Sequence, residues 1–264
     1  QIFVNYQQIK FGKISLQKIK DNLFDNREIV YNESLSIDFN NSIKLKNIYF
    51  EYDENNKIIN DLNFEIKKGQ FVGIYGDSGS GKSTFLDIFT GLLRPTEGSI
   101  YCDDILIDDK FKVRSLQNSM SYVSQDSHLA NDTILKNITL NVESKSSFNN
   151  SQFINAIKFA SLEDFINSLE KKEETKIVAI NKNLSSGQKQ RIILARLFYH
   201  LKSIIIIDEA TNALDSENEK KIVSNLAKLK NMGHTILFIS HNKINFNCCD
   251  KIFKFNNKKL VLEK

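Results

Sequence analysis

A glycine-rich stretch between an apolar run and a helical pattern constrains the fold of this chain more than any other feature. It reads G-D-S-G-S-G-K-S-T over residues 76–84, after the mostly apolar residues 70–75 and before the helically spaced residues 85–89. Glycines allow positive φ angles and close backbone approach, so successive N–H groups can converge on an anion at the positive end of a helix. A Gly/Ser-rich surface turn is the alternative, but the strand and helix in register favour a phosphate-binding loop.

The residue types in this loop suit a nucleotide. Lys82 can place a positive charge at the β- and γ-phosphates, and the Ser83 hydroxyl can bind Mg²⁺. The candidate nucleotide-binding residues of the loop are Gly76, Asp77, Ser78, Gly79, Ser80, Gly81, Lys82, Ser83 and Thr84.

Polar side chains follow three further strand patterns. Asp208 and Glu209 come directly after the apolar run 204–207, whereas Gln125 and His241 each come just after another strand pattern. Because ligands bind beyond the carboxyl ends of parallel strands, we expect these residues to share one site. Asp208 can hold Mg²⁺ through water, and Glu209 can orient or deprotonate an attacking water. An amide donor and an imidazole near a γ-phosphate suit a nucleoside triphosphatase.

Bulk composition excludes several classes of protein. The 264 residues are 41% hydrophobic and 26% charged, which is typical of a globular chain. The net charge of +4 is spread as Lys among Asp, Glu and Asn, so nucleic acid is not an expected partner. Cys102, Cys248 and Cys249 lack metal-ligand spacing and fit a reducing compartment. No apolar stretch approaches the roughly 20 residues of a membrane span.

The rest of the chain divides by pattern. Residues 43–66 alternate as strands, and buried strands alternate with helices in the second half, which predicts a parallel α/β core. Residues 126–183 differ and predict an inserted helical region. Within it, helical spacing covers 133–140, 151–160 and 162–169, with Thr133 and Ser151 as expected N-caps. A further amphipathic helix is predicted over 185–200; the residues that begin it, 184–188, make either a second anion-binding helix N-terminus or a simple cap.

The order of these motifs resembles that of the nucleotide-binding domain of ATP-binding cassette (ABC) transporters, from about residue 43 to 262. The matching segments are Tyr52 at the aromatic position that stacks on adenine, 76–84 at Walker A, Gln125 at the Q-loop, 184–188 at the signature, 204–209 at Walker B, 213–215 with Asp215 at the D-loop, and His241 at the switch histidine.

The resemblance implies an α/β fold: a P-loop NTPase (RecA-like) parallel-sheet core with an N-terminal antiparallel β subdomain and a helical subdomain at about 126–183. ATP and Mg²⁺ are the implied ligands. Two such domains would face head to tail, with Ser185, Gly187 and Gln188 contacting the nucleotide bound to the partner copy. The implied catalytic residues are Lys82, Gln125, Glu209 and His241, and the implied Mg²⁺ ligands are Ser83, Gln125 and Asp208.

Three positions depart from the family pattern. Ser186 replaces the first glycine of the usual L-S-G-G-Q signature. Residues 177–181 lack the acidic residue that exporters carry before the signature, which puts that contact to the membrane domains in doubt. The turn 199–202 lacks the family's common proline.

Other features resemble the exporter branch. The stretch T-I-L-K-N-I at 133–138 is similar to the exporters' T-I-x-x-N-I, and residues 9–29 resemble the connector that follows the last membrane helix. We therefore expect residues 1–42 to be a connector from an upstream membrane domain, a reading that the absence of an initiator Met fits. The chain would then be the C-terminal part of a half-transporter, working as a homodimer at the cytoplasmic face of the cell membrane.

Three alternatives stay open. A stand-alone ATPase subunit would dock on separate permease chains and would have an initiator Met close upstream. A soluble ABC ATPase of translation or DNA maintenance would carry two cassettes or a long coiled coil, and neither pattern is seen. A module that binds nucleotide without hydrolysing it would usually lack Glu209 or His241. The cargo cannot be read from these residues.

Overall fold

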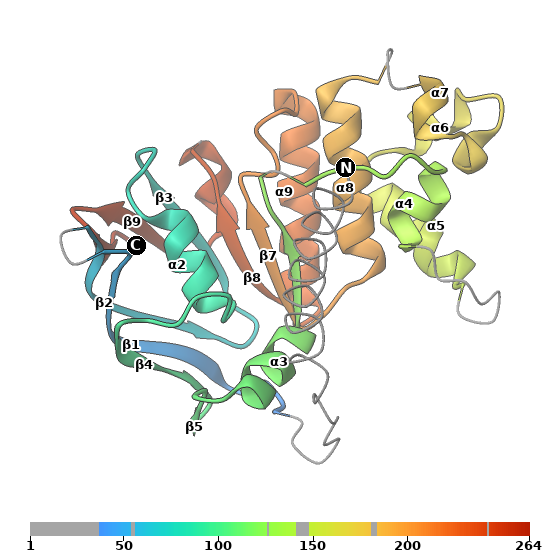
Figure 1. The fold of residues 1–264 in the computed structure, drawn as a ribbon. Coiled ribbons are helices and arrows are strands. Elements are labelled where there is room, and N and C mark those ends of the chain that lie inside the picture. The colour runs from blue at the N-terminus through green and yellow to red at the C-terminus, as the bar shows by residue number, and fades with distance from the viewer. Residues whose placement is uncertain (1–36, 54–55, 126, 141–147, 181–183, 242) are drawn as a thin grey trace, which may run out of the picture. The chain divides into compact units, whose positions relative to one another are not determined.

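The structure is a computed structural model that describes residues 37–264 apart from 54–55, 126, 141–147, 181–183 and 242. Residues 37–264 form a compact unit of their own (Figure 1). The expected connector at 9–29, and most of the proposed segment 1–42, lie outside the described residues.

The N-terminal part of this unit is an antiparallel sheet of four strands. Its strands pair in the order β2-β1-β4-β5, and the register places Ile43 opposite Ile66 and Leu45 opposite Phe64. Alternate residues of β1 are buried because one face of the sheet packs on the core. The strands are β1 (Ser42–Glu51), β2 (Lys57–Lys67), β4 (Glu97–Cys102) and β5 (Ile105–Leu106).

The second sheet has six strands in the order β10-β9-β3-β8-β7-β6, and all neighbours are parallel except β10 and β9. Every residue of the central strands β7 and β8 is buried because both faces of the sheet are covered. The strands are β3 (Phe71–Gly76), β6 (Met120–Val123), β7 (Ile204–Asp208), β8 (Thr235–Ile239), β9 (Lys251–Asn256) and β10 (Lys259–Leu262).

The isoleucines of β7 show how this sheet divides the core. Ile205 and Ile207 pack with the helices of one face, whereas Ile204 and Ile206 pack with residues of α2 and of the antiparallel sheet on the other. Side chains of a strand alternate between faces, so one apolar run supplies both halves of the core. Helix α2 (Lys82–Phe89) therefore lies between the two sheets (Figure 1).

Helices α8 (Ser186–Tyr199) and α9 (Ser216–Asn231) cover the opposite face of the parallel sheet. Short helices pack beyond α8, with contacts from α4 and α5. These match the inserted helical region expected from the sequence. Its elements are α4 (Ile134–Thr139), α5 (Asn150–Phe159), α6 (Glu163–Asn167), the 3₁₀ turn η1 (Lys172–Glu174) and α7 (Ile177–Ile180).

Two details of the predicted helices are wrong. Helix α5 is capped by Asn149 rather than Ser151, because the Asn149 side chain accepts a hydrogen bond from the Gln152 N–H. Helix α3 (Lys110–Asn118) was not predicted; it is capped by Asp109 and buries only Leu116, so its apolar periodicity is weak. The expected cap Thr133 does accept from the Lys136 N–H. The 3₁₀ turn η2 (Lys243–Cys248) follows β8.

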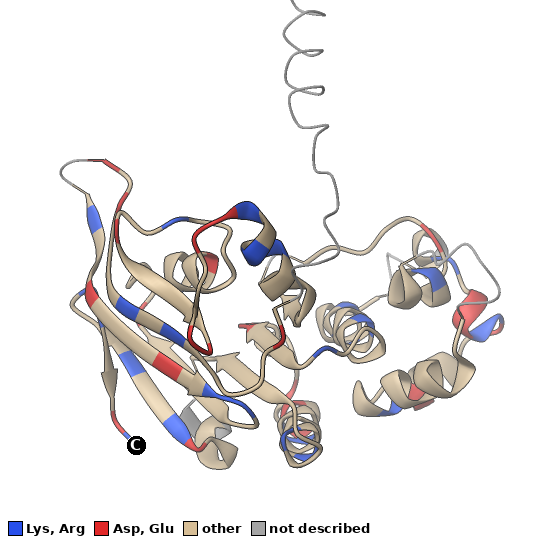
Figure 2. Cartoon of the chain, turned by 90° about the horizontal axis from the view of Figure 1, so that it is seen from below, with Lys and Arg blue, Asp and Glu red and all other residues tan. Residues whose placement is uncertain are grey.

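Lys and Arg are interspersed with Asp and Glu over the face shown in Figure 2. Within the described residues, no helix is long and apolar enough to cross a membrane.

Candidate functional site

Strand register aligns the polar residues that the sequence placed at strand ends. Residue Ile74 of β3 and Asp208 of β7 both pair with Ile239 of β8, and Val123 of β6 pairs with Ile207. The residues that follow these strands therefore emerge at the same carboxyl edge of the parallel sheet, where ligands of such sheets bind.

The glycine-rich loop turns from β3 into α2 at this edge. Gly81 is the N-cap of α2 with φ 112°, a left-handed conformation that L side chains rarely adopt. A Cβ at Gly81 would also lie 3.0 Å from the Phe255 ring. This position therefore requires glycine, and the loop leaves the first N–H groups of α2 without side-chain caps.

Lys82 folds back over the loop that precedes it. Its buried ammonium donates to the carbonyl oxygens of Gly76 at 2.8 Å and Asp77 at 2.9 Å, and lies 3.8 Å from a carboxylate oxygen of Glu209. These contacts hold a positive charge inside the loop, next to the carboxylate at the end of β7.

Glu209 is buried and has three polar partners for its side chain among the described residues. Its Oε1 lies 2.7 Å from His241 Nε2, its Oε2 accepts from the Asn212 amide at 3.2 Å, and Lys82 is the third. The Glu209 backbone is left-handed, with φ 52°, and its N–H donates to the Ile239 carbonyl at 3.1 Å. The side chain is 9% exposed, compared with 46% for His241.

Asp208 is the last residue of β7 and is buried. Burial, together with the neighbouring charge of Glu209, raises its pKa to about 6. The Tyr122 hydroxyl approaches its carboxylate at 3.5 Å. Burial and the charge of Asp208 raise the Tyr122 pKa, so the phenol is neutral and can only donate to that carboxylate.

One cavity of about 290 Å³ opens between these elements. It brings together the phosphate loop, Gln125 after β6, Glu209 after β7 and His241 after β8. Asp208 is not among its lining residues. The lining is Ile58, Ser78, Gly79, Gly81, Lys82, Ser83, Thr84, Gln125, Glu209 and His241.

Tyr52 does not line this cavity. Its ring is 55% exposed at the end of β1 and packs edge-on against Phe50, with 4.9 Å between centroids. Ile58 of β2 lines the cavity instead. The exposed Tyr52 side chain is accessible to a planar group from solvent.

The signature-like stretch begins α8, away from the cavity lining. Ser185 caps the helix in a reciprocal box with Gln188: each side chain bonds the backbone N–H of the other residue. A Cβ at Gly187 would lie 3.1 Å from the Ala213 carbonyl, so this glycine packs closely on the segment that follows β7. Ser186 is the first residue of α8 and is exposed. The structure thus leaves Ser185, Gly187 and Gln188 apart from the phosphate loop of their own chain.

Asp215, which the sequence predicts to be the D-loop residue, caps α9. Its carboxylate accepts from the Asn218 N–H at 2.9 Å, and these hydrogen bonds keep the Asp215 pKa below its ordinary value. The Ala213 N–H donates to the Gln190 side chain of α8 at 2.9 Å. The start of α8 and the segment 213–215 are therefore joined.

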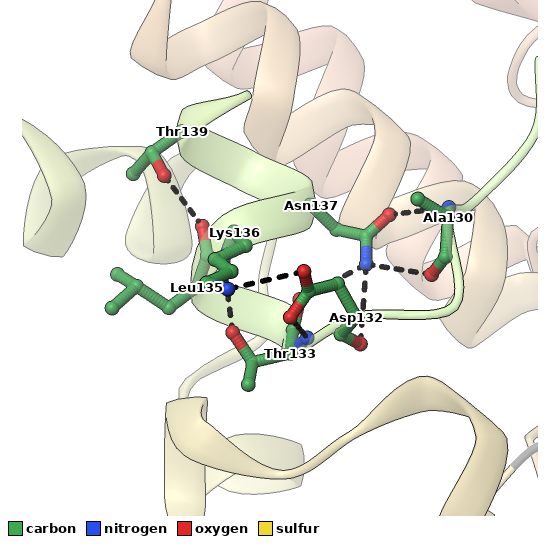
Figure 3. Close-up of polar contacts among 7 residues, drawn as sticks. All are labelled: Ala130, Asp132, Thr133, Leu135, Lys136, Asn137 and Thr139. Carbon is green, nitrogen blue, oxygen red and sulfur yellow. Dashed lines mark hydrogen bonds and ion pairs between the residues drawn. The ribbon is translucent and has the colours of Figure 1, made fainter. Parts of the chain in front are cut away.

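The segment after Gln125 is pinned by a buried asparagine (Figure 3). The Asn137 side chain accepts from the Ala130 N–H at 2.7 Å and donates to the carbonyls of Ala130 and Thr133. Arg196 of α8 donates to the Asn137 carbonyl at 2.8 Å and to the His128 carbonyl at 3.2 Å. Asn137 thus ties the loop that carries Gln125 to α4 and α8. Its place in T-I-L-K-N-I was visible in the sequence, but its role was not.

These features define an ATP-binding cassette. The family model described as "ABC transporter" matches residues 59–212, more than half of the chain. The chain belongs to the ABC transporter family, and it is a nucleotide-binding domain with the P-loop NTPase fold.

Relatives place it near exporters. A "probable ABC transporter ATP-binding/permease protein" of Haemophilus influenzae is 36% identical over 218 residues, covering 83% of this chain and 38% of the relative. An "ATP-dependent lipid A-core flippase" of Bordetella avium is 37% identical over 203 residues, covering 77% and 34%. The solved structure of a bacterial Atm1-family ABC exporter with ATP bound superposes with a TM-score of 0.82 at 31% identity, covering 97% of this chain and 44% of that one. The chain thus spans less than half the length of these proteins.

Proposed function

We propose that this chain hydrolyses ATP to ADP and phosphate and that the reaction powers transport across a membrane. The observation that carries the proposal is the single cavity lined by a cation, a hydroxyl, an amide, a carboxylate and an imidazole from separate strand ends. A site for nucleotide alone would need the loop but not the buried carboxylate facing it.

Each side chain has a role that its position supports. Lys82 holds the β- and γ-phosphates, because its ammonium already lies within the loop that would enclose them. Glu209 accepts the proton of the attacking water, and His241 keeps the Glu209 carboxylate oriented while its exposed face contacts the γ-phosphate. Gln125 orients the same phosphate from the end of β6.

The residues present fit a magnesium ion held partly by the substrate. The described residues contain no cluster of three or more His, Cys, Asp and Glu that could form a closed metal cage. Mg²⁺ usually takes one or two protein ligands together with phosphate oxygens and water. Ser83 and Gln125 line the cavity and Asp208 lies beside it, so these residues would hold the ion. When bound, Mg²⁺ would neutralise charge on the phosphates.

A second copy of the domain completes the site in this proposal. Ser185, Gly187 and Gln188 begin α8 outside the cavity of their own chain, with helix N–H groups and a close-packed glycine that suit a phosphate. They would contact the nucleotide held by the partner copy, and the partner's copies of these residues would contact this one. Asp215 lies in the segment joined to α8 and would reach the same interface.

We infer that the domain works with membrane-spanning domains, in the same full-length chain, at the cytoplasmic face of the cell membrane. The support is that the relatives are named as permeases, flippases and exporters and are more than twice as long as the part matched. A stand-alone ATPase subunit that docks on separate permeases is the second candidate. The coding sequence upstream of Gln1 discriminates between them: membrane spans there support the first and an initiator Met with none supports the second.

Glu209→Gln tests the hydrolysis. ATP turnover should fall by about 10²- to 10⁴-fold, the usual contribution of a general base, while ATP binding measured by calorimetry persists. Glu65→Gln, on the antiparallel sheet and paired only with Lys44 among the described residues, is the matched control and should keep turnover. Wild-type turnover in Glu209→Gln would remove Glu209 from this role.

A further inference from the structure

In the turn after β7, the side-chain amide of Asn212 contacts the carboxylate of Glu209, the proposed general base. Residues 209–214 fold tightly, with the Asn212 N–H donating to the Glu209 carbonyl at 3.2 Å and the Leu214 N–H to the Thr211 carbonyl at 3.0 Å. The left-handed φ of 52° at Glu209 redirects the chain at that point. As a result, the Asn212 side chain returns over the Glu209 carboxylate and donates to Oε2 at 3.2 Å.

The two carboxylate oxygens of Glu209 have different partners. Oε1 faces His241 and Lys82, from the cavity side. Oε2 has Asn212 as its donor in the described part of the chain. The terminal torsion of a glutamate is soft and broad, so a contact on Oε1 alone leaves the carboxylate plane free to swing. A second donor, on the other oxygen, defines that plane.

We propose that Asn212 is a positioning residue for ATP hydrolysis, which acts by fixing the plane of the Glu209 carboxylate. The inference rests on the proposed function of Glu209. Asn212 is not itself among the residues that line the cavity, but it donates to one that is, Glu209, so its effect passes through Glu209.

The fold of the turn does not depend on the Asn212 amide. Thr211 is held by its hydroxyl bond to Glu219 at 3.0 Å, and the Ala213 N–H by Gln190 at 2.9 Å. Asn212 itself is exposed. Truncating its side chain should therefore leave the turn folded, which separates a positioning role from a structural one.

Steady-state kinetics of three variants of this chain test the proposal. Asn212→Ala should lower kcat about tenfold, with KM for ATP within about twofold and an unchanged melting temperature. Asn212→Ser retains a hydroxyl donor and should recover part of kcat. Asn212→Asp keeps the shape but places an acceptor against a carboxylate, so it should be at least as impaired as Asn212→Ala. Asn63→Ala, which removes an exposed amide that donates to the Asp61 carboxylate at 3.3 Å, should match wild type.

Two results would overturn the proposal. One is a wild-type kcat in Asn212→Ala. The other is an equal loss in all three Asn212 variants together with a lower melting temperature, because that pattern marks a structural role. If the wild-type chain itself shows no turnover, the proposed function fails. Crystal structures of wild type and Asn212→Ala then test the positioning role separately. The Glu209 carboxylate plane should rotate in the variant, and an unmoved plane refutes the positioning role.

Discussion

Tyr52 has the position of a ring that could lie against a nucleotide base, but its own chain leaves it half exposed. Its ring lies edge-on against Phe50, and the residue is 55% exposed. Because this exposed ring would give up few contacts within the protein when a planar ligand covers it, the free energy of stacking would add directly to ATP affinity.

Tyr52→Ala should weaken ATP binding by about 1 to 3 kcal/mol, the range for stacking of a base on an aromatic side chain. Tyr52→Phe keeps the ring and should bind ATP as wild type does. Calorimetric titration of both variants measures the difference. Equal affinity of Tyr52→Ala and wild type would place the adenine elsewhere.

The raised pKa of Asp208 makes the metal-free chain sensitive to pH. Its carboxyl titrates at about 6 in the folded chain, against an ordinary value of 3.8. Between these values the folded state binds more protons than the unfolded state, so the free energy of unfolding falls as pH rises through the interval. The stabilising contribution of the protonated group is complete below about pH 4 and is lost as pH rises through about 6.

Urea unfolding of wild type and Asp208→Asn between pH 4 and 7, without Mg²⁺, measures this contribution. Wild type should lose stability relative to the variant as pH rises, because the variant keeps a neutral side chain throughout. A difference that stays constant with pH would mean that the Asp208 carboxyl titrates normally in the folded chain.

At the scale of elements, buried polar contacts add to the apolar packing that joins the helical region to the parallel-sheet core. Asn137 satisfies backbone groups of the loop after Gln125, and Arg196 adds α8 to the same cluster. Removing the Asn137 amide would leave its partners in a part-buried site without their hydrogen bonds.

Asn137→Ala should therefore lower the free energy of unfolding by about 1 to 3 kcal/mol. Asn225→Ala removes one amide bond to the Phe159 carbonyl at 2.9 Å and one exposed bond from Lys228 at 3.0 Å, and it should cost less. Chemical denaturation of both variants against wild type gives the comparison. Equal losses would show that the Asn137 cluster contributes no more than these two ordinary hydrogen bonds.

For the whole molecule, the separation between the cavity and the start of α8 predicts association that depends on nucleotide. Glu209→Gln should sediment as a monomer without ATP and as a dimer with ATP and Mg²⁺, because slow turnover keeps ATP in the interface. Gly187→Glu in the same background should bind ATP but stay monomeric, since it places negative charge where the partner's phosphates would lie. A stable dimer without ATP would contradict the head-to-tail proposal.

The fold was largely predictable because its signals are local. The apolar runs at 204–207 and 235–239, the alternation of 43–66 and the helical spacing beyond residue 126 each report the burial of a short segment. Helix α3 was missed because it buries only Leu116, and the cap of α5 was misplaced because Asn149 and Ser151 are both good cap residues.

Local sequence patterns predicted the phosphate loop and the polar residues after the strands, because both patterns depend on neighbouring residues only. Contacts between distant strands settle which of these residues meet. The order β3-β8-β7-β6 and its register, which pair residues far apart in the chain, bring Gln125, Glu209 and His241 level with the loop. Tyr52 and Ser185 do not line that cavity, and the Asn212 side chain donates to Glu209. Local sequence pattern cannot encode these outcomes, since strand order and register are set by packing across the whole core.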